Sequence, residues 1–241
     1  MLFSELAGYF DKIENVSSRL EMSGILSEML SKAGAKEIGM VIYLLQGVLG
    51  PRHTALEAGI GEGLLEQGIA KATGYPKEEV GKLYKQMGDL GLVAEKLVEG
   101  KKQGSLFSEK LTVAKVFGNF VRIAEAKGKG SVELKLNMFA ELINSASKTE
   151  ARYIARVPLG NLRLGVGDPT IMDALALNYL GEFTGNKKIR KEIEGGLKEK
   201  KDEKRAEEFR LRAKQRLREI IEAKYNIFSD LGVIAQKLKE K

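Results

Sequence analysis

A glycine-rich pattern occurs twice in this chain, with its two copies 106 residues apart. Residues 59–70 and 165–176 both fit G-[IV]-G-[ED]-x-x-[LI]-x-x-[GA]-[IL]-A. A second pair follows in the same order, because residues 88–97 recur as residues 229–238. Repeats that keep their order along the chain indicate a duplicated unit, and two similar halves are expected to pack as a pseudo-twofold pair.

The bounds of the two halves follow from these matches. We expect a first repeat over about 2–99, a connector over 100–110 and a second repeat over about 111–238. The offset grows from 106 residues at the glycine pattern to 141 at the second pattern, so the second half carries an insertion of 35 residues at about 181–215. Single residues upstream align as well: Glu37 with Glu150, Gly47 with Gly160, Phe10 with Phe120 and Ile13 with Ile123.

The second glycine turn has the chemistry of an anion contact. Asp168 is suited to cap a helix, and Pro169 to occupy its first position. Gly165 and Gly167 allow close approach to the backbone, while the unpaired amides of a helix start favour a phosphate. A turn of this kind also serves simply to connect two packed helices. Because the turn recurs, we favour a symmetric double contact, for which duplex DNA is a suitable ligand.

The spacing of apolar residues predicts an all-α fold of about twelve helices. Residues 113–124 carry a wide apolar stripe at helical spacing. Residues 147–150 form a capping box, and further helix starts are expected at Pro76 and Ser131. No segment alternates at the period of a strand.

The positive charge of the chain is concentrated in one segment. Residues 187–218 contain 14 Lys and Arg against 7 Asp and Glu, which accounts for the whole net charge of +7. This excess suits an anionic partner, although a run rich in Lys and Glu is also typical of a solvated helix. We expect a long, mostly solvated helix whose C-terminal part docks on the body of the protein.

Composition excludes several kinds of chemistry. The chain has no Cys and a single His, His53, which lies in a turn, so disulfides, thiolate sites and His-dependent triads are excluded. We expect no catalytic, cofactor-binding or metal-binding residues. There is also no apolar run long enough to span a membrane and no secretory signal. We therefore expect a cytoplasmic protein with no membrane contact, associated with the nucleoid if its ligand is duplex DNA.

Together these motifs resemble the N-terminal DNA-binding domain of ATP-dependent DNA ligases of the archaeal and eukaryotic type, most closely the archaeal replicative form. The resemblance covers the whole chain except the insertion. The matching segments fall in family order: GIGEG (59–63), KATG (71–74), DLG (89–91), QGSLFSEKLT (103–112), FVRIAEA (120–126), GS (130–131), ARVPLG (155–160) and RLGVG (163–167).

The resemblance implies a non-catalytic, pseudo-twofold helical module that grips the minor groove of nicked double-stranded DNA in replication, repair and recombination. Close backbone approach and positive helix ends are independent physical reasons for the same assignment. Pro169 stands where the first turn has Gly63, so the two contacts cannot be identical. The implied DNA-binding residues are Gly59, Gly61, Gly63, Arg163, Gly165 and Gly167, with Thr170, Arg156, Lys101, Lys102 and Lys127 as weaker candidates.

The connector has a separate family interpretation. Archaeal ligases of this type carry a short motif here for the sliding clamp (PCNA), and residues 103–107 are similar to it. Gln103 would enter a polar pocket, with Leu106 and Phe107 as hydrophobic anchors. The alternative is that Leu106 and Phe107 pack on the domain's own core.

The motif for catalysis is missing. The family attaches AMP to a lysine in a Lys-x-Asp-Gly motif, which does not occur in this sequence. The chain is therefore expected to be inactive alone, with ATP and Mg²⁺ needed only by catalytic domains in cis or on a separate chain. A second possible function is that of a helical adaptor that binds the sliding clamp and another protein.

Overall fold

The computed structural model describes residues 1–54, 56–100, 110–195 and 202–240. The prediction of an all-α fold is confirmed, with fourteen α-helices and two short 3-10 helices in the described residues rather than about twelve helices. The helices are α1 Phe3–Glu14, α2 Arg19–Lys32, α3 Ala35–Leu45, α4 Glu62–Thr73, α5 Lys77–Met87, α6 Leu90–Glu99, α7 Val113–Glu125, α8 Ser131–Ser145, α9 Lys148–Arg156, α10 Asp168–Asn178, α11 Leu180–Gly185, α12 Lys187–Gly195, α13 Asp202–Phe228 and α14 Leu231–Lys239, with η1 Arg52–Thr54 and η2 Val157–Leu159.

The helices begin where local chemistry satisfies their first amides. The predicted capping box precedes α9, with Ser147 and Glu150 bonding each other's backbone amides. Asp89 caps α6 by accepting from the Gly91 amide, and Asp230 caps α14 by accepting from the Val233 amide. The predicted stripe on α7 is buried, with Val121 only partly so.

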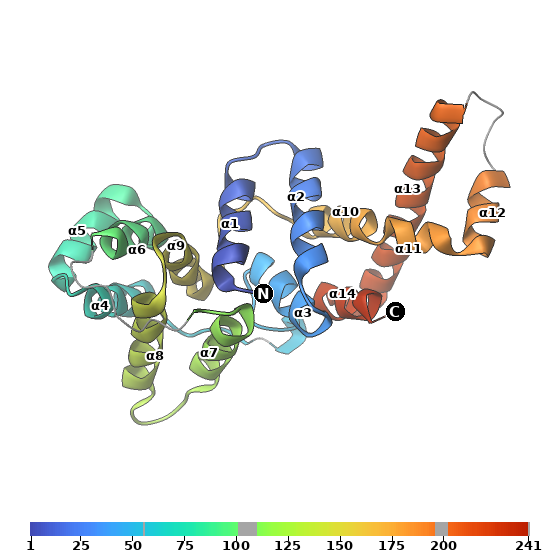
Figure 1. Cartoon of the computed structure of the whole chain (residues 1–241). Coiled ribbons are helices and arrows are strands. Elements are labelled where there is room, and N and C mark those ends of the chain that lie inside the picture. Colours follow the sequence, from blue (N-terminus) through green and yellow to red (C-terminus); the bar gives the residue numbers. More distant parts are fainter. Residues whose placement is uncertain (55, 101–109, 196–201, 241) are drawn as a thin grey trace.

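The helices form two lobes, and each lobe draws on both halves of the sequence (Figure 1). In one lobe α6 packs against α9 and α4 against α8. In the other, α14 packs against α3 and α10 against α2. A single cluster of buried apolar residues runs through both lobes. The last helix of each half therefore buries its apolar face on the other half.

Residues that the repeat pairs with each other meet at the centre of the molecule. The Phe3 amide donates to the Leu111 carbonyl at 2.8 Å, and the Val113 amide donates to the Met1 carbonyl at 3.2 Å. Gly47 lies against Gly160, whose carbonyl oxygen would be 2.2 Å from a Cβ at position 47. The two halves thus meet at corresponding segments, and the pseudo-twofold axis stays a prediction.

The charged insertion includes a helical hairpin that projects from the second lobe (Figure 1). Leu180, Ile193 and Ala213 give this hairpin a small apolar core of its own. Towards the C-terminal end of α13, Leu217 and Ile221 join the main core. Among the described residues, none of the helices has both the length and the apolar character needed to cross a membrane.

Candidate nucleic-acid interface

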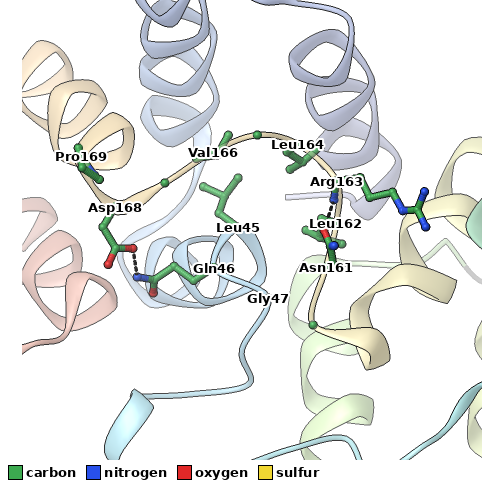
Figure 2. Close-up of a pocket in the computed structure, with 13 residues that line it drawn as sticks. Leu45, Gln46, Gly47, Asn161, Leu162, Arg163, Leu164, Val166, Asp168 and Pro169 are labelled. Carbon is green, nitrogen blue, oxygen red and sulfur yellow. Dashed lines mark hydrogen bonds between the residues drawn. The ribbon is translucent and has the colours of Figure 1, made fainter.

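Two grooves, each of about 510 Å³, meet where Gly47 touches Gly160. The first groove is lined by 47–49, 56–61 and 157–160. The second is lined by 45–47 and 160–169, and Figure 2 shows the segment 161–169 passing over Leu45 and Gln46. The wall of each groove is the segment that leads into a glycine-turn helix, α4 in one half and α10 in the other. The predicted glycine turns thus line two adjoining grooves.

Both segments alternate between buried apolar residues and exposed residues, among them the glycines of the turns. In the segment before α10, Leu162 and Leu164 point inward and are buried, whereas Gly165 and Gly167 are exposed. The segment before α4 shows the same pattern: Ala58 and Ile60 are buried and Gly59 and Gly61 are exposed, as is Gly63 at the second position of α4. The apolar residues fix each segment to the core, and the outward side exposes glycine backbone beside the side chains of Glu57, Asn161 and Arg163.

Backbone conformation favours glycine at some of these positions and not at others. Gly59 and Gly165 have φ of 60° and 65°, a left-handed conformation that disfavours other residues. A Cβ at Gly61 or Gly63 would have no neighbour within 4 Å, and one at Gly167 would make ordinary contact with Pro169. The internal packing of the chain therefore does not require glycine at Gly61, Gly63 or Gly167.

The amides of these glycines are available to a ligand. Within the described residues, the backbone N–H groups of Gly59, Gly61, Gly63, Gly165 and Gly167 donate to no acceptor. Exposed amides at the start of a helix attract anions. The open amides of the two glycine turns can each hold part of an extended anionic chain.

The structure corrects the predicted cap of α10. Gly167, not Asp168, is the N-cap, just as Gly61 is the N-cap of α4. Asp168 is the first residue of the helix, and its carboxylate accepts from Gln46 at 2.7 Å and Tyr225 at 2.6 Å. Pro169, expected at the first helical position, holds the second, as Gly63 does in α4, so α10 lacks the amide that Gly63 supplies there.

Arg163 is half exposed, at 52% of its side chain, and has φ of 59°. Its guanidinium donates to the Gly88 carbonyl at 2.8 Å and lies 3.6 Å from Asp89. The side chain thus reaches the C-terminal end of α5, where a cation is favourable. Figure 2 shows the side chain pointing away from Leu45 and Gln46, out of the second groove.

Arg156 is corrected from a weak DNA contact to a buried structural residue. Its side chain is 2% exposed, and its guanidinium donates to Glu14 at 2.8 Å, Asp89 at 2.7 Å and the Leu162 carbonyl at 3.1 Å. Burial alone would raise the pKa of Asp89 and of Glu14, but hydrogen bonds from Arg156 lower both pKa values overall. Arg156 ties the second groove wall to the core.

The structure describes two of the other residues predicted to contact DNA or the sliding clamp. Thr170 is buried, and its amide donates to the Gly167 carbonyl, so it too is removed as a surface contact. Lys127 is exposed in the turn before α8 and does not line either groove. The remaining candidates lie outside the described residues: Lys101, Lys102, Gln103, Leu106 and Phe107.

Sequence reasoning missed Lys135. Its ammonium on α8 lies 3.3 Å from the Ala58 carbonyl and 3.4 Å from the Gly59 carbonyl, beside the first groove. Lys135 is 76 residues from Gly59, and no local pattern connects the two. No group of three or more potential metal-binding side chains occurs in the described part of the chain.

Two open grooves that share Gly47 and Gly160 run beside the two glycine-turn segments. The chain belongs to the family "DNA ligase N terminus", whose model matches residues 2–176. The DNA ligases of Nitrosopumilus maritimus and Saccharolobus solfataricus are each 35% identical, over 99% and 100% of this chain and 35% and 36% of their own length. The DNA ligase of Staphylothermus marinus is 44% identical over 75% of this chain and 32% of its length. The chain spans about a third of the length of these relatives.

Proposed function

We propose that this chain is the DNA-binding module of an ATP-dependent DNA ligase and that it grips nicked duplex DNA through phosphate and minor-groove contacts. The paired grooves would each receive one stretch of the sugar–phosphate backbone on either side of the nick. The adenylation chemistry, with ATP and Mg²⁺, would belong to catalytic domains in cis or on a separate chain. The module acts in DNA replication and repair.

The exposed glycines carry this proposal. Gly61, Gly63 and Gly167 are neither in a left-handed conformation nor in a tight internal contact. Gly63, inside a helix, even lowers stability relative to alanine. A partner whose backbone approaches these positions closely explains glycine there, and the open amides beside them supply donors for phosphate oxygens.

The test is a salt titration of binding to nicked and intact duplex of one sequence, with Arg163→Ala as the variant. For the wild type, the logarithm of the association constant should fall linearly with the logarithm of salt concentration. Arg163→Ala should weaken binding and make the salt slope shallower by about 0.9, because one phosphate contact is lost. Unchanged affinity with native circular dichroism would remove Arg163 from the interface, and equal, weak binding to both duplexes would contradict the module itself.

We also propose that residues 103–107 bind a sliding clamp. Leu106 and Phe107 have the apolar bulk of interface anchors, and Gln103 can hydrogen-bond. Replacing both Leu106 and Phe107 with alanine should abolish clamp capture in a pull-down with purified clamp. DNA affinity should not change in the same variant, and loss of DNA binding together with helical content would show instead that these residues belong to the core.

A further inference from the structure

A tyrosine meets an acidic residue beside each groove, at positions that the repeat pairs with each other. Tyr84 on α5 donates to Glu62 at 2.7 Å, and Tyr225 on α13 donates to Asp168 at 2.6 Å. Glu62 and Asp168 are the first residues of α4 and α10. The two contacts span 22 and 57 residues of sequence, so the second persists although the inserted hairpin precedes Tyr225.

The backbone fixes both tyrosines in the same way. Each lies four residues before a residue with left-handed φ, Gly88 at 66° and Ser229 at 49°. The amides of these two residues donate to the carbonyls of Tyr84 and Tyr225 and so end each helix. Each tyrosine is therefore presented at a fixed place on the last turn of its helix, beside the acid.

The acids are an obstacle to a polyanion. Asp168 lines the second groove, and Glu62 is exposed next to Gly61 in the first. A carboxylate there repels phosphate and competes for the same open amides. In the second half both oxygens of Asp168 are engaged, one by Tyr225 and one by Gln46, and the side chain turns beneath the segment (Figure 2).

We infer that Tyr84 and Tyr225 are positioning residues that hold Glu62 and Asp168 away from the path of the DNA backbone. This inference rests on the proposed function. The hydroxyl group fixes the direction of the carboxylate, so that the acid can begin its helix without occupying the amides in front of it. The tyrosines act through the acids and need not touch DNA.

The test compares four variants of the full chain on a nicked DNA duplex: Tyr84→Phe, Tyr225→Phe, and each of these combined with neutralisation of its acid, Glu62→Gln or Asp168→Asn. Each Tyr→Phe variant should bind about fivefold more weakly, equivalent to ~1 kcal/mol, because the carboxylate loses the hydroxyl group that holds one of its oxygens and can turn toward phosphate. Each double variant should recover wild-type affinity or exceed it, since the charge that the tyrosine restrained is gone. Thermal unfolding of all four establishes that they fold.

Tyr9→Phe is the matched control. Tyr9 donates to Glu28 at 2.6 Å, between α1 and α2, and neither residue lines a groove. Its DNA affinity should equal that of the wild type. Wild-type affinity in both groove variants, or double variants as weak as the single ones, would overturn the inference while leaving the module intact. A wild-type chain that fails to bind nicked duplex would refute the proposed function and this inference with it.

Discussion

Replacing Gly61 and Gly167 together with alanine is expected to weaken binding to nicked duplex by roughly tenfold to a hundredfold, because a charge-assisted hydrogen bond to phosphate contributes about 1.5–3 kcal/mol. Each methyl group would stand on the exposed side of its segment and keep the DNA backbone from the amides. The fold should tolerate both changes, since their φ of −83° and −106° suit alanine and the added Cβ atoms meet no clash. Binding isotherms at several salt concentrations measure the loss.

Two further measurements separate a binding effect from a folding effect. The free energy of unfolding of the double variant should fall by only about 1–2 kcal/mol, the summed cost of alanine at two helix N-caps. Gly181→Ala is the matched control, because Gly181 is exposed on α11 with no heavy atom within 4 Å of its Cβ position, and it should bind DNA normally. Full affinity in the double variant would mean that the grooves do not hold the duplex.

Arg156→Met is expected to destabilise the protein by about 3–5 kcal/mol, because it removes one partner from a buried ion pair and leaves the other uncompensated. Asp89 is only 4% exposed and would lose its closest cation. Methionine keeps most of the length of the side chain, so little of the effect arises from a cavity. Chemical denaturation at neutral pH gives the free energy of unfolding.

Arg190→Met provides the contrast. Arg190 pairs with Glu194 four residues along an exposed helix, and losing such a pair should cost about 0.5 kcal/mol or less.

Acidification probes the buried network of Arg156 with Asp89 and Glu14. Because the folded pKa values of Asp89 and Glu14 are lowered, the stability they add is present at neutral pH and is lost as pH falls below about 4. That acid-dependent loss should be smaller in Arg156→Met, and an equal loss would exclude the network as its source.

Features governed by neighbouring residues were predictable from the sequence. The capping box before α9 and the stripe on α7 depend on contacts within one or a few turns, and both are present. The glycine turns were recognised because they repeat, and in the structure each lies directly before a helix. The all-α class follows from the sum of such local signals.

Features governed by distant residues were not predictable from the sequence. Arg156 resembles any exposed basic residue near a turn, and its partners Glu14 and Asp89 lie 142 and 67 residues away. The cap of α10 was misplaced because the carboxylate of Asp168 turns to Gln46 and Tyr225, distant side chains that local capping rules ignore. The tyrosine pair did leave a signal in the sequence. Tyr84 and Tyr225 are 141 residues apart, the same offset that relates residues 88–97 to residues 229–238, and they lie four residues before these two segments.

The crossed packing of α6 on α9 and α14 on α3 bears on how this chain reaches its native state. Ordinary helical bundles fold fast because neighbouring helices pair with each other, whereas here the last helix of each half must wait for a partner from the other half. Long loops must close before these contacts stabilise anything, which slows folding. The first hundred residues leave an apolar face on α6 uncovered until α9 has been synthesised, so a newly made first half remains exposed to aggregation until the second half arrives.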